Sequence, residues 1–314
     1  MGNLQRLAQI LRQITVEPVL FTYMFCIFLS FPVLQQLAFK KICHENFNET
    51  VCTNIRHKDF TTQNEQVASA TSQWILYQSI GLAIPSIFAS LVFGSWSDRV
   101  GRRIVMILPP VGGLLLNINY LLNVHFFLLN VNYLLFGIII SGFFGGFATV
   151  LLSVFAYISD ISSKTERTLR VGLLEAMLFF GATISNLVGG VLLEYSGFMA
   201  PFGLALALNI CIMLYICFIL QESYHPPDRY EGGWSLIVLH EHFKNGVDVI
   251  CKKRSGSNRL HLNILLFIVF TINLLGKDLG FRIGAYYCFI MQINPYPDTN
   301  FYSNICDETA CINK

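Results

Sequence analysis

The sequence predicts an all-α protein, specifically a polytopic bundle of transmembrane helices. Of its 314 residues, 54% are hydrophobic and 13% are charged, and the mean hydropathy is +0.55. This is about half the charge of an ordinary soluble domain. The apolar residues gather into runs of roughly 18 to 25, the length that a helix needs to cross a hydrocarbon core. Lys and Arg cluster in the gaps between alternate runs, and a water-soluble fold does not fit this pattern.

Seven runs are expected to span the membrane. They lie near residues 18–38, 73–96, 104–124, 130–158, 169–193, 201–220 and 261–278. The first run continues past signal-peptide length without a small-residue cleavage site, so we expect it to be retained. The sequence thus divides into an N-terminal segment, a six-helix bundle, a polar loop, a seventh span and a divergent, poorly ordered tail. These parts are 1–17, 18–220, 221–260, 261–278 and 279–314.

The placement of basic residues predicts that the amino terminus is cytoplasmic. The N-terminal segment holds two Lys or Arg, residues 97–103 and 159–170 hold three each, and residues 221–260 hold six. The other connections hold only Lys40, Lys41, Arg56 and Lys58. Basic loops stay in the cytoplasm, so the loop at 39–72 is expected outside.

Two features of this outer loop suit an extracytoplasmic position. Asn48-Glu49-Thr50 is an acceptor sequon for N-glycosylation at Asn48, and Cys43 and Cys52 can oxidise. Cys52 is also a candidate for a bridge to a tail cysteine such as Cys288. No metal-site spacing, nucleic-acid patch, phosphate loop or nucleophile and base pair occurs in the loops, so we predict no cofactor and no enzyme activity.

The stretch GSWSDRVGRR, residues 94–103, places unusual charge between the second and third runs. Gly94 and Asp98 share a helix face, and Gly101 permits a tight turn before Arg102 and Arg103. An aspartate at a helix carboxyl end meets partial negative charge and needs a partner. A neighbouring helix amino terminus or an arginine would make a latch that closes and opens. The alternative is a set of ordinary basic anchors beside a solvated acid.

This stretch resembles the signature of the major facilitator superfamily, G-x-x-x-D-x-x-G-R-R between the second and third spans. Residues 71–103, 154–176 (VFAYISDISSKTERTLRVGLLEA) and 201–209 (PFGLALALN) further resemble solute carrier family 46. The resemblance implies a secondary transporter that couples inward proton flow to uptake of a small organic anion, folate-like or otherwise conjugated. Alternating access between two six-helix halves would move the anion. Family members have twelve spans, so we expect a truncated product, with a non-transporting membrane fragment as the alternative.

The expected partners are therefore protons, a small organic anion and the lipid bilayer, and a homo-oligomer is left open. We expect the plasma membrane, with a lysosomal or endosomal membrane as the alternative. In span four this chain has Ile138 and Gly146 where the resemblance implies an arginine and an aspartate. In span seven it has Asn273 in place of a histidine. These departures from the resemblance count against folate as the substrate.

The candidate proton carrier is Glu175, one to two turns inside the fifth span. A charged group there costs on the order of 2 to 3 kcal/mol or more, so it must be protonated, paired or in a wet cavity. The resemblance ties this position to proton coupling, and pairing with Arg170 is the alternative. Asp160 precedes Arg167 and Arg170, and it either belongs to the cytoplasmic gate or caps the next helix.

Weaker candidates remain in the loops and at the outer end of span two. His240 and His242 lie in the loop where the resemblance implies proton-gating histidines, although loop histidines are usually solvated. Trp74, Tyr77 and Gln78 form either an aromatic belt or the mouth of a substrate site.

Overall fold

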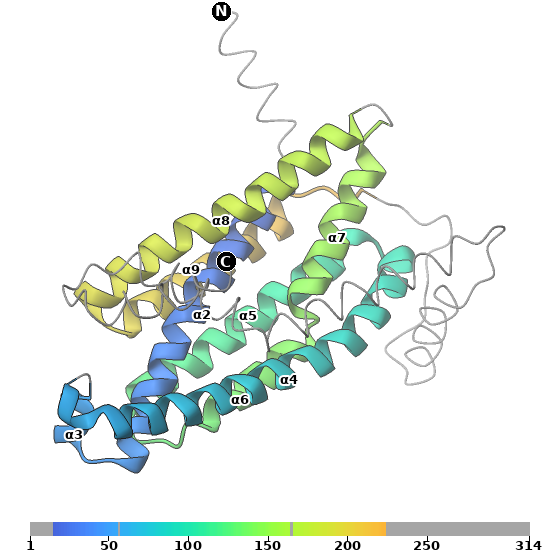
Figure 1. Cartoon of the computed structure of the whole chain (residues 1–314). Helices are drawn as coiled ribbons and strands as arrows, with labels where there is room; N and C mark the ends of the chain where they lie inside the picture. The colour runs from blue at the N-terminus through green and yellow to red at the C-terminus, as the bar shows by residue number, and fades with distance from the viewer. Residues whose placement is uncertain (1–14, 56, 164–165, 224–314) are drawn as a thin grey trace, which may run out of the picture. The chain divides into compact units, whose positions relative to one another are not determined.

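The computed structural model describes residues 15–55, 57–163 and 166–223, and every described element is helical (Figure 1). The chain divides into two units, Met1–Lys252 and Lys253–Lys314, and the described residues all belong to the first. The helices are α2 (Glu17–Asn46), α3 (Glu49–Thr53), η1 (Lys58–Phe60), α4 (Thr61–Val100), α5 (Arg102–His125), α6 (Tyr133–Phe143), α7 (Gly146–Ile161), α8 (Arg167–Ser196) and α9 (Met199–Phe218).

Six segments of the described chain are long and apolar enough to cross a membrane. They are α2, α4 as far as Asp98, α5, the pair α6 and α7, α8, and α9. These segments correspond to the first six predicted runs, so the all-α polytopic prediction is confirmed for this part of the chain. The predicted seventh span, 261–278, lies outside the described residues.

The helices around the predicted outer loop are longer than expected. Helix α2 continues to Asn46 and α4 already begins at Thr61, so most of 39–72 is helical. The polar end of α2 is held by specific partners. Lys41 is 1% exposed, and its Nζ donates to the carbonyl oxygens of Phe127 at 3.0 Å and Leu129 at 2.9 Å. Hydropathy identifies only the apolar part of such a helix, and the predicted end of the first span, near residue 38, is therefore earlier than the end of α2 at Asn46.

The predicted Cys52–Cys288 bridge is wrong. Cys52 is bonded to Cys43, with 5.8 Å between their Cα atoms. The extension of α2 carries Cys43 past the membrane-spanning part, and the short helix α3 turns Cys52 back toward it. A separation of nine residues thus closes a local loop. Cys288 lies outside the described residues.

The fourth span is interrupted, whereas the sequence predicted one continuous run over 130–158. Helix α6 ends at Phe143, and α7 starts at Gly146. Gly145, directly before α7, has φ of +82°, and Gly146, the first residue of α7, has φ of +48°; such backbone favours glycine. The Gly-Gly pair therefore allows the chain to leave one helix and start another within the span.

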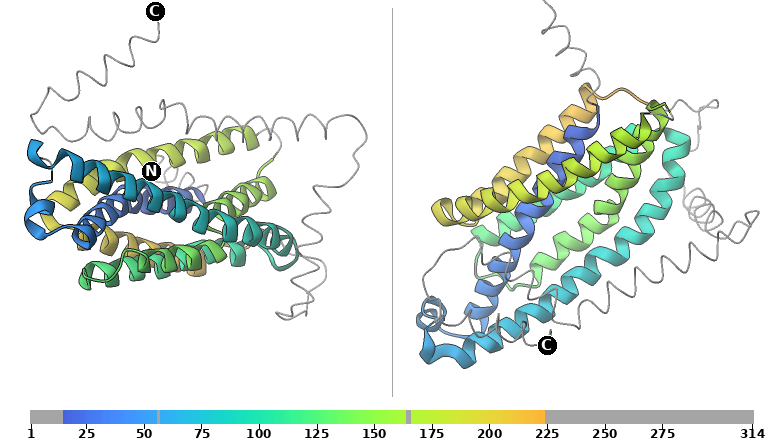
Figure 2. Two further views of the ribbon diagram at one scale, coloured as in Figure 1. Left: turned by 60° about the horizontal axis from the view of Figure 1, so that its bottom comes forward. Right: turned by 45° about the horizontal axis from the view of Figure 1, so that its top comes forward.

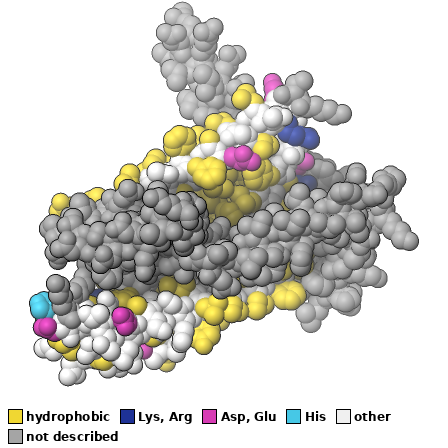
Figure 3. Space-filling model, in the orientation of Figure 1, with side chains coloured by type: hydrophobic (Ala, Val, Ile, Leu, Met, Phe, Trp, Pro, Cys, Tyr) yellow, Lys and Arg dark blue, Asp and Glu magenta, His cyan; other side chains and the backbone are white. Residues whose placement is uncertain are grey.

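Helix α2 is the most buried of the spans, because α8 and α9 both pack along it (Figure 2). Helix α5 packs on α9, while α6 and α7 lie against α4 and α5. Helices α4 and α8 are the least buried and expose large apolar side chains. These include Tyr77, Ile87, Phe88, Phe179, Phe180 and Leu187. Figure 3 shows such hydrophobic side chains on the visible face, as expected for a surface that meets lipid or another apolar partner.

Every second connection between the spans lies at the same end of the bundle, which we call the latch end. It consists of the start of α2, the α4–α5 turn, the α7–α8 connection and the end of α9. The Tyr215 hydroxyl donates to the Thr15 carbonyl oxygen at 2.8 Å, and the Tyr157 hydroxyl donates to that of Gln221 at 2.9 Å. These bonds join segments that the count of basic residues had assigned to one side.

Candidate functional site

The α4–α5 turn at the latch end depends on Gly101. Its φ of +111° and ψ of 160° fall in a region that is essentially restricted to glycine. A Cβ atom at this position would lie 2.7 Å from Glu222 Oε2. Gly101 is therefore required both by backbone conformation and by the close approach of a carboxylate. At Gly94 the corresponding Cβ would lie 3.5 Å from Leu152 Cδ1, an ordinary contact.

Arg102 connects two carboxylates at the latch end. Its Nη1 lies 2.7 Å from Asp98 Oδ1, and its Nε lies 3.0 Å from Asp160 Oδ2. Nη1 also donates to Ser97 Oγ at 3.1 Å. The Arg102 side chain is 13% exposed, against 26% for Asp160 and 64% for Asp98. Asp98 thus has an arginine partner, one of the two kinds expected, and the stronger contact is the less exposed one to Asp160.

Glu222 caps the amino terminus of α5. Its Oε1 accepts from the Arg102 backbone N–H at 2.8 Å, and its Oε2 accepts from that of Arg103 at 3.1 Å. A carboxylate is favourable at this position because the first N–H groups of a helix lack intrahelical partners and carry partial positive charge. Sequence reasoning missed Glu222. The only available signal was an acid directly after the sixth apolar run.

Two further arginines hold the carboxyl ends of neighbouring helices. Arg103 donates from Nε to the Ile216 carbonyl oxygen at 2.7 Å and from Nη2 to that of Cys217. Arg167 donates from Nη2 to the Ser159 carbonyl oxygen at 2.7 Å. The last carbonyl groups of a helix are partly negative and otherwise unpaired, so a guanidinium is a favourable partner. Arg103 thereby ties the α4–α5 turn to α9, and Arg167 ties α8 to α7, while the ion pair of Arg102 with Asp160 ties the turn to α7.

Glu175 and Arg170 do not form the pair considered from the sequence. Both lie on α8, where Glu175 is exposed and Arg170 is partly buried. The Glu175 carboxylate makes no ion pair or hydrogen bond with the described residues. Arg170 Nη1 is buried and likewise has no hydrogen-bond partner in this part of the chain. Five residues along a helix rotate the side chain by about 140°, which explains why the two do not meet.

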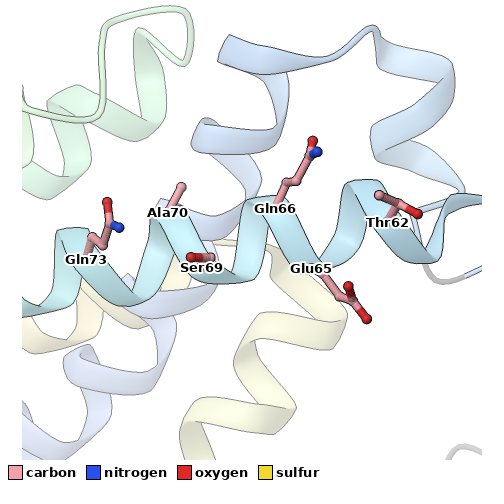
Figure 4. A pocket seen from close by; sticks show the side chains of 6 residues that line it. All are labelled: Thr62, Glu65, Gln66, Ser69, Ala70 and Gln73. Carbon is pink, nitrogen blue, oxygen red and sulfur yellow. The ribbon is translucent and has the colours of Figure 1, made fainter.

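The outer end of α4 is divided between a buried face and an open one. Trp74 and Gln78 are 3% and 6% exposed, and Tyr77, on the other face, is 59% exposed. A shallow hollow lies nearby on the surface of the first turns of α4 (Figure 4). It is lined by Thr62, Glu65, Gln66, Ser69, Ala70 and Gln73. The three residues proposed as a substrate mouth do not line it.

The remaining candidates are placed as follows. Asn48 is exposed and immediately precedes α3, so its side chain is accessible. His240 and His242 lie outside the described residues. Within residues 15–55, 57–163 and 166–223, no cluster of three or more His, Cys, Asp or Glu side chains is arranged to hold a metal ion.

The sequence of this chain is similar to those of several membrane transporters. A proton-coupled folate transporter of Bos taurus is 30% identical over 295 residues, covering 90% of this chain and 61% of the relative. The Rattus norvegicus protein of the same name is 31% identical, covering 88% and 61%. A lysosomal proton-coupled steroid conjugate and bile acid symporter of Gallus gallus is 28% identical, covering 82% and 57%. The chain therefore spans about 61% of the length of the first two relatives.

A sequence model of the whole family extends over most of the chain. The family model described as "Major Facilitator Superfamily" matches residues 16–296, a range that includes all the described helices and the latch. Because this match covers well over half of the chain, it settles the family. The chain belongs to the Major Facilitator Superfamily, a family of membrane transporters and not of enzymes.

Proposed function

We propose that this chain forms part of a proton-coupled symporter for a small organic anion that works by alternating access. The observation that carries the proposal is the combination of a multi-helix latch at one end of the bundle with Glu175, a carboxylate inside a membrane span that has no ion-pair partner among the described residues. The relatives are named as proton-coupled transporters of folate or of steroid conjugates and bile acids. Because the chain spans about 61% of their length, the activity of the whole protein is a proposal.

The latch is suited to opening and closing because its bonds are polar and partly exposed. The Asp98–Arg102–Asp160 network lies at the protein surface, where each ion pair contributes only about 0–1 kcal/mol. The Glu222 cap and the Arg103 contacts act between helix ends and not within the apolar core. Separating the helix ends would therefore leave the packed bundle intact. We propose that the latch opens when the binding site changes the side that it faces.

Glu175 is the proposed proton carrier. It lies eight residues after Arg167, so it is about 12 Å along α8 from the helix start. A carboxylate at this depth is stable only when it is protonated or faces a wet cavity. Protonation from one side and release to the other would couple the proton gradient to the movement of the anion. His240 and His242, which follow α9 in the sequence, are proposed to assist this transfer.

We propose a conjugated organic anion as the substrate in preference to folate. The chain carries Ile138 and Gly146 in the fourth span, where charged residues were expected for a folate carrier. A bile acid or steroid conjugate is a large apolar body with one anionic group, and it needs fewer charged partners. The plasma membrane is the proposed location, with a lysosomal or endosomal membrane as the alternative.

Uptake measurements test this function. Labelled cholate and folate are offered at pH 5.5 and pH 7.4 to cells that express the full chain. We expect more cholate uptake at pH 5.5, and Glu175→Gln should abolish the pH dependence while surface expression persists. Glu194→Gln is the matched control, because Glu194 is an exposed glutamate near the other end of the same helix. An unchanged pH dependence in Glu175→Gln would remove Glu175 from the mechanism.

A second candidate is a non-transporting membrane protein, because the described apolar helices fit any membrane-embedded bundle. In the same assay, a chain that reaches the cell surface and takes up neither probe at either pH would support it. Co-expression with a tagged second copy would then show whether the chain self-associates.

A further inference from the structure

The break in the fourth span places the amino terminus of a helix inside the membrane. The span extends over Tyr133–Ile161, and α7 starts at Gly146, close to its midpoint. The 16 residues of α7 then continue to the latch end. Transporter binding sites are often built around such broken helices, because the positive end of a half-helix faces an anionic group.

The first amide groups of α7 are available as donors. The Thr149 N–H bonds to the Gly145 carbonyl oxygen at 3.3 Å, which closes the first helical turn. The N–H groups of Gly146, Phe147 and Ala148 precede that bond and have no intrahelical acceptor. Their alignment also gives this end a partial positive charge. A negatively charged oxygen is the partner that satisfies both properties.

A buried hydroxyl independently indicates a missing partner at this position. Thr149 is 0% exposed, and its Oγ1 has no hydrogen-bond partner among the described residues. It is aimed at the break, because a Cβ atom added to Gly145 would collide with Thr149 Oγ1. Buried hydroxyl groups are normally hydrogen-bonded, since an unmade bond costs folding free energy. The Thr149 hydroxyl, which has no partner among the described residues, therefore lies beside Gly145, the residue that immediately precedes the first amide groups of α7.

The groups at the break favour an anion over a cation. The Gly145 carbonyl oxygen already accepts from Ser86 Oγ at 2.8 Å, so an obvious ligand for a cation is occupied. The remaining groups are N–H donors and the Thr149 hydroxyl, which also donates. No Lys, Arg, Asp or Glu occurs in α6, or in α7 before Asp160, so the backbone supplies the positive potential. Phe147 is 45% exposed and leaves the first turn of α7 open on one side.

We propose that the Gly145–Gly146 break binds the carboxylate or sulfonate group of the transported anion. The amides at the start of α7 and the Thr149 hydroxyl donate to its oxygen atoms. The inference rests on the proposed function, and it adds the place where the anionic group is held. It also explains how a span without charged residues at its centre can recognise a charged substrate.

The test compares two probes that share one steroid body and differ in charge and in one methyl group. Cholate and its uncharged methyl ester are bound to the purified full-length chain in lipid nanodiscs. Thr149→Val keeps the shape of the side chain and removes the hydroxyl. We expect it to weaken cholate binding about tenfold, the effect of one hydrogen bond to a charged group, and to leave ester binding unchanged. Thr149→Ser should retain cholate affinity.

A matched control and a second variant separate binding from folding. Thr183→Val removes a hydroxyl on α8 that bonds within its own helix, to the Phe179 carbonyl oxygen at 2.9 Å, and should not change cholate affinity. Ser86→Ala removes one of the two donors to the Gly145 carbonyl oxygen, which then carries more negative charge beside the anion, and it should weaken cholate binding about threefold. This second variant decides the question if Thr149→Val does not fold.

Three results would overturn the proposed subsite. They are no cholate binding by the unaltered chain, a Thr149→Val affinity within twofold of it, or an equal loss for cholate and its ester. Uptake measured in parallel distinguishes the two proposals. Binding that depends on Thr149, without proton-driven uptake, would refute the transport function alone. Uptake that is unaffected by Thr149→Val would refute the subsite alone.

Discussion

Replacing Gly101 with alanine tests the turn that organises the latch. The alanine would have to adopt φ near +111°, a conformation that costs a residue with a side chain about 1–3 kcal/mol. Its Cβ would also lie 2.7 Å from Glu222 Oε2, so the carboxylate must move. Weakening this charged cap adds about 1 kcal/mol. We therefore expect Gly101→Ala to lower the free energy of unfolding by about 2–4 kcal/mol.

The control for this substitution is the other glycine of the same motif. Gly94 lies inside α4, and an added Cβ would make an ordinary 3.5 Å contact with Leu152. Alanine is favoured over glycine inside a helix by about 0.5–1 kcal/mol. Gly94→Ala should thus leave the free energy of unfolding unchanged or raise it slightly. The free energies of unfolding of the two alanine variants are therefore predicted to differ by at least about 2 kcal/mol.

Reversible unfolding of the purified full-length chain in detergent mixtures measures both effects. The double variant Gly101→Ala/Glu222→Ala identifies the cause, because removal of the carboxylate relieves the collision. The alanine at Gly101 should then cost only the backbone part, about 1–3 kcal/mol. Gly101→Ala with unaltered stability, or with the same effect as Gly94→Ala, would refute the account of this turn.

The remaining predictions concern the latch and the outer end of the bundle. Asp160→Asn should destabilise the chain by about 0.5–1 kcal/mol and Arg102→Gln, which loses two ion pairs, by about 1–2 kcal/mol, and a double-mutant cycle should give a coupling of at least 0.5 kcal/mol; additive effects would contradict the bond. Cys52→Ser should lower the free energy of unfolding by about 2–3 kcal/mol. Non-reduced peptide mass spectrometry should recover Cys43 linked to Cys52, and any other main partner would contradict the pairing. Asn48→Gln should remove a glycosidase-sensitive mass shift on gels, which the unaltered chain must show.

Hydrophobic periodicity and charge placement were sufficient for the fold class. Long apolar runs require helices in a membrane, because the lipid offers no partner for the backbone groups. The motif at 94–103 was also visible in the sequence, and the position of Asp98 at a helix carboxyl end predicted that its carboxylate has a partner. The sequence prediction placed the ends of α2 and α4 wrongly, since polar residues continue these helices beyond their apolar parts. The pairing of Cys52 was wrong for the same reason, because it depends on the extended end of α2.

The sequence by itself therefore determined that the chain is a membrane-spanning helical bundle and where its charged turn lies, because these properties depend on local composition. Only the tertiary structure decided which groups meet. Glu222 accepts a hydrogen bond at the start of α5 although it is 120 residues away in the sequence, and Arg102 donates to Asp160 on another helix. The break at Gly145 and the orphan hydroxyl of Thr149 are likewise visible only in three dimensions. Such contacts depend on how helices pack, and no short stretch of sequence specifies that packing.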